Sequence, residues 1–258
     1  MGMKTKIYVN NEKFITGTTL QDSTNYENNN MALHQCENPE QIIENRKQLA
    51  QFLEIGLEDF VCAKQTHSVN FHNVIEADRG RGAFSLDTAI PETDALYTFE
   101  PNIMLSCFTA DCVPVIFYNE ISGVVGVIHS GWKGTVNEIT LRVFQHLVEA
   151  EKCDPEDFFV WLGPALSQEK FEVDVDVFEK FDALGYAREF ILYREMTKKY
   201  HIDNQKTVKK QCELAGIPSK QISMDRTCTF LSEEGFSYRE DRRAGRHLSF
   251  VMKKKVEE

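Results

Sequence analysis

Two histidines and one cysteine have the residue types and the setting that a catalytic metal site requires. His67, Cys112 and His129 each stand at or just beyond the end of an apolar run, 45 residues apart (67 to 112) and 17 residues apart (112 to 129). Imidazole nitrogen and thiolate sulfur suit zinc, and three protein ligands leave a fourth position open for catalysis. His67, Cys112 and His129 are therefore the candidate metal ligands.

Neighbouring residues offer alternatives to this set. No local motif such as HExxH joins the three positions, so their spacing alone is a weak signal. His72 fits the local pattern as well as His67, whereas Cys107 lies inside an apolar strand and is expected to be structural. Asp111 is a candidate general acid or base beside Cys112. Support of the metal ligand or of the turn is an equal alternative for its carboxylate.

The same residues are compatible with other functions. Cys112 as nucleophile and His129 as base would give an amidase or deamidase without a metal. Copper also binds His and Cys sites tightly, but the chain has seven histidines and no HxH pair, which disfavours a multicopper polyphenol oxidase. A non-catalytic binding or regulatory domain is the alternative from a different class.

Predicted strands must bring these side chains together. His67 follows a strand, Cys112 lies in a break between two strands, and His129 ends a strand and opens the turn SGWKG at residues 130–134. Glycines in such a turn let backbone N–H groups approach a ligand. Extended segments are predicted at residues 60–64, 95–98, 103–109, 114–118, 124–129, 158–162, 221–224 and 247–252. The short connection at 119–123 predicts a hairpin.

Helical periodicity alternates with these strands. Helices are predicted at residues 39–53, 137–151, 176–184 and 204–215. Thr135 and Glu138 fit a capping box at the start of the second of them. No linker or repeat divides the sequence. We therefore expect one α/β (mixed α+β) domain over residues 1–258, with mixed, largely antiparallel sheets flanked by helices.

The overall composition excludes several classes of protein. The 258 residues carry a net charge of −11, which disfavours binding to nucleic acid or to anionic membranes. No segment approaches the ~20 consecutive apolar residues of a membrane span. The seven cysteines are irregularly spaced and include no CxxC, as expected in a reducing compartment. We expect a cytoplasmic protein, either a monomer or a homodimer.

Several motifs together resemble a known family. They are NNMALH (29–34), NR (45–46), KQTHS (64–68), TDALYT (93–98), FTADCVPV (108–115), GVIHSGWKGT (126–135), GPALSQEKFEV (163–173), CT (228–229), FSYR (236–239) and GR (245–246). The combination of TADC with HSGWKG is highly specific. The sequence resembles the YfiH/YlmD family, also called polyphenol-oxidase or laccase-domain proteins and viewed as multifunctional purine nucleoside phosphorylases.

The resemblance implies both a metal centre and substrates. It implies a zinc ion held by His67, Cys112 and His129, with copper as the alternative metal. It also implies phosphorolysis of adenosine, inosine and methylthioadenosine, and hydrolytic deamination of adenosine. The implied fold is the mixed-sheet arrangement shared with a bacterial toxin deamidase of Cys-His type.

Phosphorolysis adds a requirement for local positive charge. The substrates would be small purine nucleosides and phosphate, and an acidic protein must concentrate cations where phosphate binds. Arg46, Lys133 and Arg239 are the candidates for this role.

Overall fold

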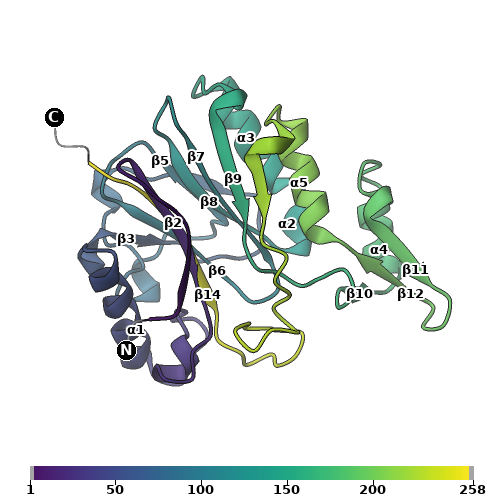
Figure 1. The fold of residues 1–258 in the computed structure, drawn as a ribbon, viewed down its shortest axis with the longest axis horizontal. Coiled ribbons are helices and arrows are strands. Elements are labelled where there is room, and N and C mark those ends of the chain that lie inside the picture. The colour runs from purple at the N-terminus through teal and green to yellow at the C-terminus, as the bar shows by residue number, and fades with distance from the viewer. Residues whose placement is uncertain (1–2, 256–258) are drawn as a thin grey trace.

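Two mixed β-sheets lie face to face at the centre of the molecule, and the computed structural model describes residues 3–255 (Figure 1). The first sheet has the order β1 (Thr5–Asn10), β2 (Phe14–Thr19), β14 (His247–Lys253), β6 (Met104–Thr109) and β3 (Phe60–Cys62). The second has the order β13 (Ile222–Met224), β9 (Phe158–Leu162), β7 (Val113–Asn119), β8 (Val125–Ser130), β5 (Ala95–Thr98) and β4 (Phe71–Asn73). Neighbouring strands are antiparallel except in the pairs β3–β6, β9–β13 and β4–β5.

Apolar side chains from both sheets fill the space between them. Leu105 and Val251 of the first sheet belong to the same buried cluster as Ile116 and Val127 of the second. All residues of β6, β7 and β8 are buried, because both faces of these strands are covered. Two of the predicted metal ligands lie at the ends of these central strands: Cys112 just before β7 and His129 in β8.

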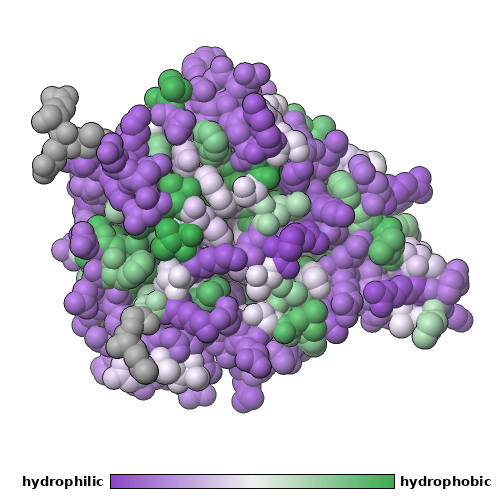
Figure 2. Space-filling view, in the orientation of Figure 1, coloured by the Kyte–Doolittle hydropathy of each residue, from purple (hydrophilic) through white to green (hydrophobic). Residues whose placement is uncertain are grey.

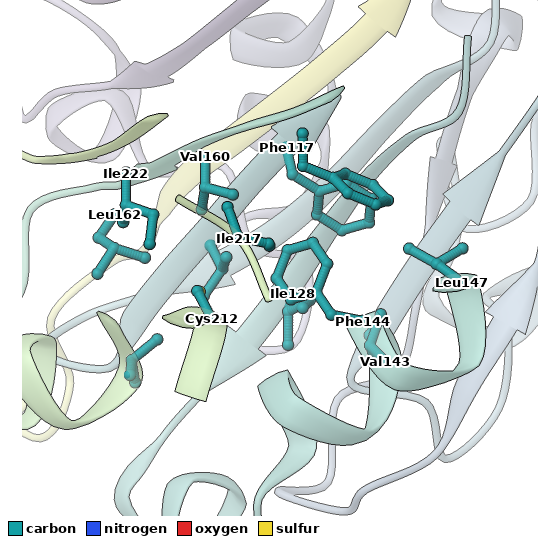
Figure 3. Packing of buried hydrophobic residues seen from close by; sticks show 14 of the residues in the cluster. Phe117, Ile128, Val143, Phe144, Leu147, Val160, Leu162, Cys212, Ile217 and Ile222 are labelled. Atoms are coloured by element: carbon teal, nitrogen blue, oxygen red, sulfur yellow. The ribbon is translucent and has the colours of Figure 1, made fainter. Parts of the chain in front are cut away.

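Helices cover the outer faces of the two sheets. Helices α3 (Ile139–Glu149) and α5 (Asn204–Leu214) pack on the six-stranded sheet. Phe144 of α3 contacts Phe117 (Figure 3), and it also contacts Phe158. Helix α1 (Pro39–Phe52) packs on the five-stranded sheet through Leu49 and Ala50. The layers thus run helix, sheet, sheet, helix, which buries the apolar face of every main element.

A smaller unit extends from one end of the molecule (Figure 1). It contains α4 (Val175–Asp182) and an antiparallel sheet of β10 (Glu172–Val173), β12 (Lys199–Ile202) and β11 (Ile191–Arg194). Its own apolar cluster includes Phe171, Phe181 and Ile202. The long segment between β13 and β14 contacts the start of this unit, where Arg239 donates hydrogen bonds to the carbonyls of Lys170 and Glu172.

Most of the predicted elements are confirmed, including the hairpin formed by β7 and β8. The helix predicted over 137–151 is α3, but its capping box is wrong: α3 begins at Ile139 after a separate short helix, α2 (Trp132–Val136), and Glu138 between them is left-handed (φ 63°). The Glu138 carboxylate accepts a hydrogen bond from the Tyr186 hydroxyl instead. The Thr135 hydroxyl donates to the Gly131 carbonyl, so neither side chain caps α3.

The surface shown in Figure 2 is mostly hydrophilic, and its hydrophobic residues form small separate groups. Within residues 3–255, no helix has the length and apolar character needed to cross a membrane.

Candidate metal centre and its cavity

The structure brings His67, Cys112 and His129 together. One ligand atom from each residue lies within 4.8 Å of the other two. Cys112 Sγ is 3.8 Å from His67 Nε2, and the centroids of the two imidazole rings are 4.7 Å apart. Neither alternative belongs to this group: His72 pairs with Asp78, and Cys107 is part of the buried apolar cluster between the sheets.

The β7–β8 hairpin explains how Cys112 meets His129. Pro114 of β7 pairs with His129 of β8, so the residue just before β7 lies beside the turn that follows His129. Asp111 adopts a left-handed conformation (φ 87°) that directs the chain from β6 into β7. His67 lies in the loop after β3 and is also left-handed (φ 61°).

Asp94 holds both histidines in place, and its side chain is fully buried. Its carboxylate accepts hydrogen bonds from the backbone N–H of His67 (3.0 Å), the backbone N–H of Ser68 (2.7 Å) and His129 Nδ1 (2.8 Å). Burial opposes its ionisation, but these hydrogen bonds, led by that from His129, lower the pKa of Asp94 to about 2. Because His129 donates through Nδ1 to Asp94, its Nε2 is the atom that faces Cys112 and that would bind a metal after losing its proton.

Gly131 provides the space in which the ligands meet. A β-carbon at this position would lie 2.9 Å from Cys112 Sγ and 2.7 Å from Cδ2 of His67. Both distances are shorter than van der Waals contact, so an alanine would displace the ligands. The donor set, its orientation by Asp94 and the space above Gly131 fit a metal ion.

Cys112 and His129 form a coupled acid–base pair. Burial opposes ionisation of the thiol, but attraction to the His129 ring and hydrogen bonds from His129 and His67 lower the pKa of Cys112 to about 6. Burial likewise opposes the charged form of His129, but the neighbouring sulfur and Asp94 raise its pKa to about 9. The proton therefore prefers the ring, and the sulfur is available as a thiolate.

A cavity of about 740 Å³ opens over these three residues. This volume is in the range of small-molecule sites. Aromatic side chains line it, namely His34, Phe108, Trp132, Phe171 and Tyr238. Charged side chains line it as well, namely Asp111, Lys133, Glu172, Asp174, Asp176, Arg239 and Arg246. The cavity thus combines flat apolar surfaces with charges of both signs.

Comparison with known protein families identifies the family of this chain. A family model described as multi-copper polyphenol oxidoreductase laccase matches residues 14–254. The chain belongs to this laccase-like family.

The chain is similar over most of its length to named proteins and to solved structures. The chain is 32% identical over 253 residues to "Purine nucleoside phosphorylase YlmD" of Bacillus subtilis, covering 96% of this chain and 91% of the relative. It is 34% identical over 225 residues to the YlmD protein of Geobacillus stearothermophilus, covering 86% and 82%. The crystal structure of Bacillus licheniformis hypothetical protein YfiH matches with a TM-score of 0.88 and 33% identity, covering 93% and 92%. The mixed α/β fold is that of the YfiH/YlmD structures.

Asp111 lies in the cavity wall of this laccase-like chain but has other partners. Its Oδ1 accepts a hydrogen bond from the Thr229 hydroxyl (2.7 Å), and its Oδ2 accepts one from the Arg239 backbone N–H (2.6 Å). The carboxylate therefore fastens the segment between β13 and β14 beside the metal ligands. Support of the turn, the alternative to acid–base catalysis, is the role that fits these contacts.

The structure does not place Arg46 at the cavity, so its assignment to phosphate binding is corrected. Arg46 is 1% exposed, and its guanidinium donates hydrogen bonds to the carbonyls of Met31, Gly82 and Ala83. These bonds tie α1 to two loops, which is a structural role. Its link to the site is indirect, through the Phe108 ring 5.0 Å away.

The other two candidates for phosphate binding, Lys133 and Arg239, line the cavity and are exposed. The sequence reasoning gave no role to Asp94 or Arg246. Both lie in motifs of the family resemblance, TDALYT and GR, but neither is near a ligand in the sequence. The signal for Asp94 was a carboxylate just before a mostly apolar strand, where an acid needs a partner.

Proposed function

We propose that this chain is a zinc-dependent purine nucleoside enzyme. It phosphorolyses adenosine, inosine and methylthioadenosine to the free base and the ribose 1-phosphate or methylthioribose 1-phosphate, and it deaminates adenosine by hydrolysis. The observation that carries the proposal is the His67, Cys112 and His129 cluster at the wall of a cavity with aromatic and cationic side chains. Relatives that align over most of the chain are named purine nucleoside phosphorylases.

Zinc is the metal that best suits this donor set. Two imidazoles and one thiolate are typical of a catalytic zinc site, which would supply a Lewis acid to the cavity. Copper is the alternative because it also binds His and Cys strongly. Within residues 3–255, one group of His, Cys, Asp or Glu side chains is close enough together to hold a metal. A single group supports a mononuclear site over multicopper oxidase chemistry.

The residues of the cavity fit the two halves of a nucleoside reaction. Trp132, Phe108 and Tyr238 offer aromatic surface on which a purine could stack. Lys133 and Arg239 supply positive charge, which an acidic protein needs locally to bind phosphate. Asp94 keeps the His129 ring fixed, so that the ligand set is held ready before substrate binds.

A second candidate function follows from the same hydrogen bonds. Asp94, His129 and Cys112 form a chain in which a carboxylate orients a histidine beside an ionised thiol. A cysteine nucleophile needs this arrangement. A metal-free amidase or deamidase is therefore the alternative.

We place this activity in one domain over residues 1–258, acting in the cytoplasm on small molecules rather than on nucleic acid. All seven cysteines are free, which supports a reducing compartment.

A nucleoside panel tests the proposed function. Adenosine, inosine and methylthioadenosine are incubated with zinc-loaded protein, with and without phosphate, and the products are separated by chromatography. We expect free base and sugar phosphate only with phosphate, and inosine from adenosine without it. Cys112→Ala should abolish both reactions, whereas the matched control Cys107→Ala should retain them. Absence of every product from the wild-type protein would contradict the proposal.

A further inference from the structure

Arg246 lines the cavity, and nothing described so far gives it a role. It is half-buried just before β14, and its Nη1 donates hydrogen bonds to the carbonyls of Ala244 and Gly245. Among residues 3–255, its Nε and Nη2 atoms have no hydrogen-bond partner and its guanidinium has no ion-pair partner. The side chain therefore keeps unused donors at the cavity and makes no direct ion pair within residues 3–255.

The acidic residues of the same cavity do not neutralise this charge. Three of the four carboxylates have other partners: Thr229 and the Arg239 N–H for Asp111, His201 for Glu172, and Lys199 for Asp174. Burial lowers the pKa of Arg246, while the nearby Cys112 and Asp111 favour its charged form. A partly buried cation without a protein counterion is costly unless an anion joins it.

We propose that Arg246 binds the phosphate co-substrate of phosphorolysis, a site that rests on the proposed function. A guanidinium presents two parallel donors that match two oxygens of a phosphate dianion. The contacts through Nη1 and the Tyr238 ring, 5.9 Å from the guanidinium carbon, hold the side chain in one position. Arg246 thus has the phosphate-binding role that the sequence had predicted for Arg46.

The other two cations of the cavity have a different setting. The Lys133 ammonium is exposed and lies 5.7 Å from the Trp132 ring centre. The Arg239 side chain is exposed, and its Nη1 donates to the carbonyls of Lys170 (3.2 Å) and Glu172 (3.1 Å). Water screens exposed charges more than half-buried ones. Lys133 and Arg239 attract phosphate to the cavity, and Arg246 holds it there.

The kinetics of phosphorolysis and deamination distinguish phosphate binding by Arg246 from a role in both reactions or in folding. Arg246→Gln should raise the apparent phosphate KM of inosine phosphorolysis about tenfold or more, as expected for loss of a charge-assisted contact. Adenosine deamination, which needs no phosphate, should change by less than about twofold. Arg243→Gln is the matched control, because Arg243 lies in the same segment with an 88% exposed side chain. An unchanged phosphate KM in Arg246→Gln, or an equal loss of both activities, would overturn the inference.

Direct binding distinguishes failure of this inference from failure of the proposed function. Inorganic phosphate is titrated calorimetrically into zinc-loaded full-length protein with 9-deazainosine, a nucleoside whose C-glycosidic bond cannot be cleaved, at constant ionic strength. Binding to the wild type that weakens in Arg246→Gln supports the site even if no nucleoside is turned over. Equal binding to both proteins, or none to the wild type, overturns it. If Arg246→Gln does not fold, Arg246→Lys replaces it, because lysine keeps the positive charge but lacks the two parallel donors of the guanidinium. The same weakening of phosphate binding is expected.

Discussion

At the scale of single residues, Asp94 connects the fold to two of the proposed metal ligands, His67 and His129. One carboxylate receives the backbone of the His67 loop and the Nδ1–H of His129, so it fixes two of the three ligands at once. A carboxylate that accepts from a ligating histidine fixes the ring orientation and raises the basicity of the nitrogen that binds the metal. The position of the site therefore depends on a residue that is not itself a ligand.

Replacing Asp94 tests this dependence. Asp94→Asn keeps the shape but loses the charge and one acceptor oxygen, so zinc affinity should fall roughly 10- to 100-fold. Competition with a chromophoric chelator measures the affinity. Asp225→Asn is the matched control, because Asp225 has a 7% exposed side chain and pairs with Lys6 at 2.7 Å but lies outside the cavity wall. Unchanged zinc affinity in Asp94→Asn would show that the ligands do not need this support.

At the scale of elements, the segment between β13 and β14 is held by a small number of buried anchors. His247 is fully buried, and its Nδ1 donates to the Thr19 carbonyl while its Nε2 accepts from the Phe236 backbone N–H. Asp111 holds the same segment at the cavity through Thr229 and Arg239. These anchors bring Tyr238, Arg239 and Arg246 to the cavity from a part of the chain without regular secondary structure.

The neutral state of His247 makes stability depend on pH. Burial, together with the nearby positive charge of Arg246, lowers the pKa of His247 from 6.5 to about 4. A proton on Nε2 would also break the hydrogen bond from the Phe236 backbone N–H. Its contribution is therefore complete above pH 6.5 and is lost as pH falls toward 4, up to about 3 kcal/mol.

Urea unfolding of the metal-free protein at several pH values measures this contribution. His247→Gln keeps an acceptor for the Phe236 N–H but does not titrate. The difference in unfolding free energy between wild type and variant should therefore shrink below pH 6.5. A constant difference across this range would mean that His247 is not held neutral.

Local patterns predicted the elements well where the pattern was strong. The apolar runs of β6, β7 and β8 and the periodicity of α1 and α5 needed no tertiary information. The N-terminal strands β1 and β2 and the short strands β4 and β10 to β12 were missed, because their short length and many polar residues give little local signal. The capping box failed because Glu138 has a tertiary partner, Tyr186.

The candidate site was predictable only in part, because some of its residues are positioned by tertiary contacts. His67, Cys112 and His129 could be named from residue type, strand ends and family motifs, and the structure brings them within 4.8 Å. Arg46 was misassigned because a charged residue on a helix is usually exposed, whereas this one bonds to carbonyls of two distant loops. The role of Asp94 depends on contacts with His67 and His129, 27 and 35 residues away in the sequence, which no local pattern encodes. The position of Arg246 in the cavity wall likewise depends on the tertiary fold.

At the scale of the whole molecule, the site lies where separate layers meet. His67 follows β3 of one sheet, His129 lies near the end of β8 in the other, and Cys112 lies in the turn that leads from β6 in the first sheet to β7 in the second. The small unit with α4 and the segment before β14 complete the cavity. Packing of the two sheets therefore sets the distances between the ligands, and the ligands should stay close together without a metal.

Removal of the metal tests the central claim most directly, because the zinc enzyme and the cysteine nucleophile use the same residues. A strong chelator should remove a catalytic zinc that has an open coordination position, and added Zn²⁺ should refill the site. We expect metal-free protein to deaminate no adenosine and to phosphorolyse no inosine, with both activities returning upon addition of about one equivalent of Zn²⁺ per chain. Full activity in metal-free protein, with a covalent adduct on Cys112 detected by mass spectrometry during turnover, would contradict the metalloenzyme and establish the cysteine nucleophile.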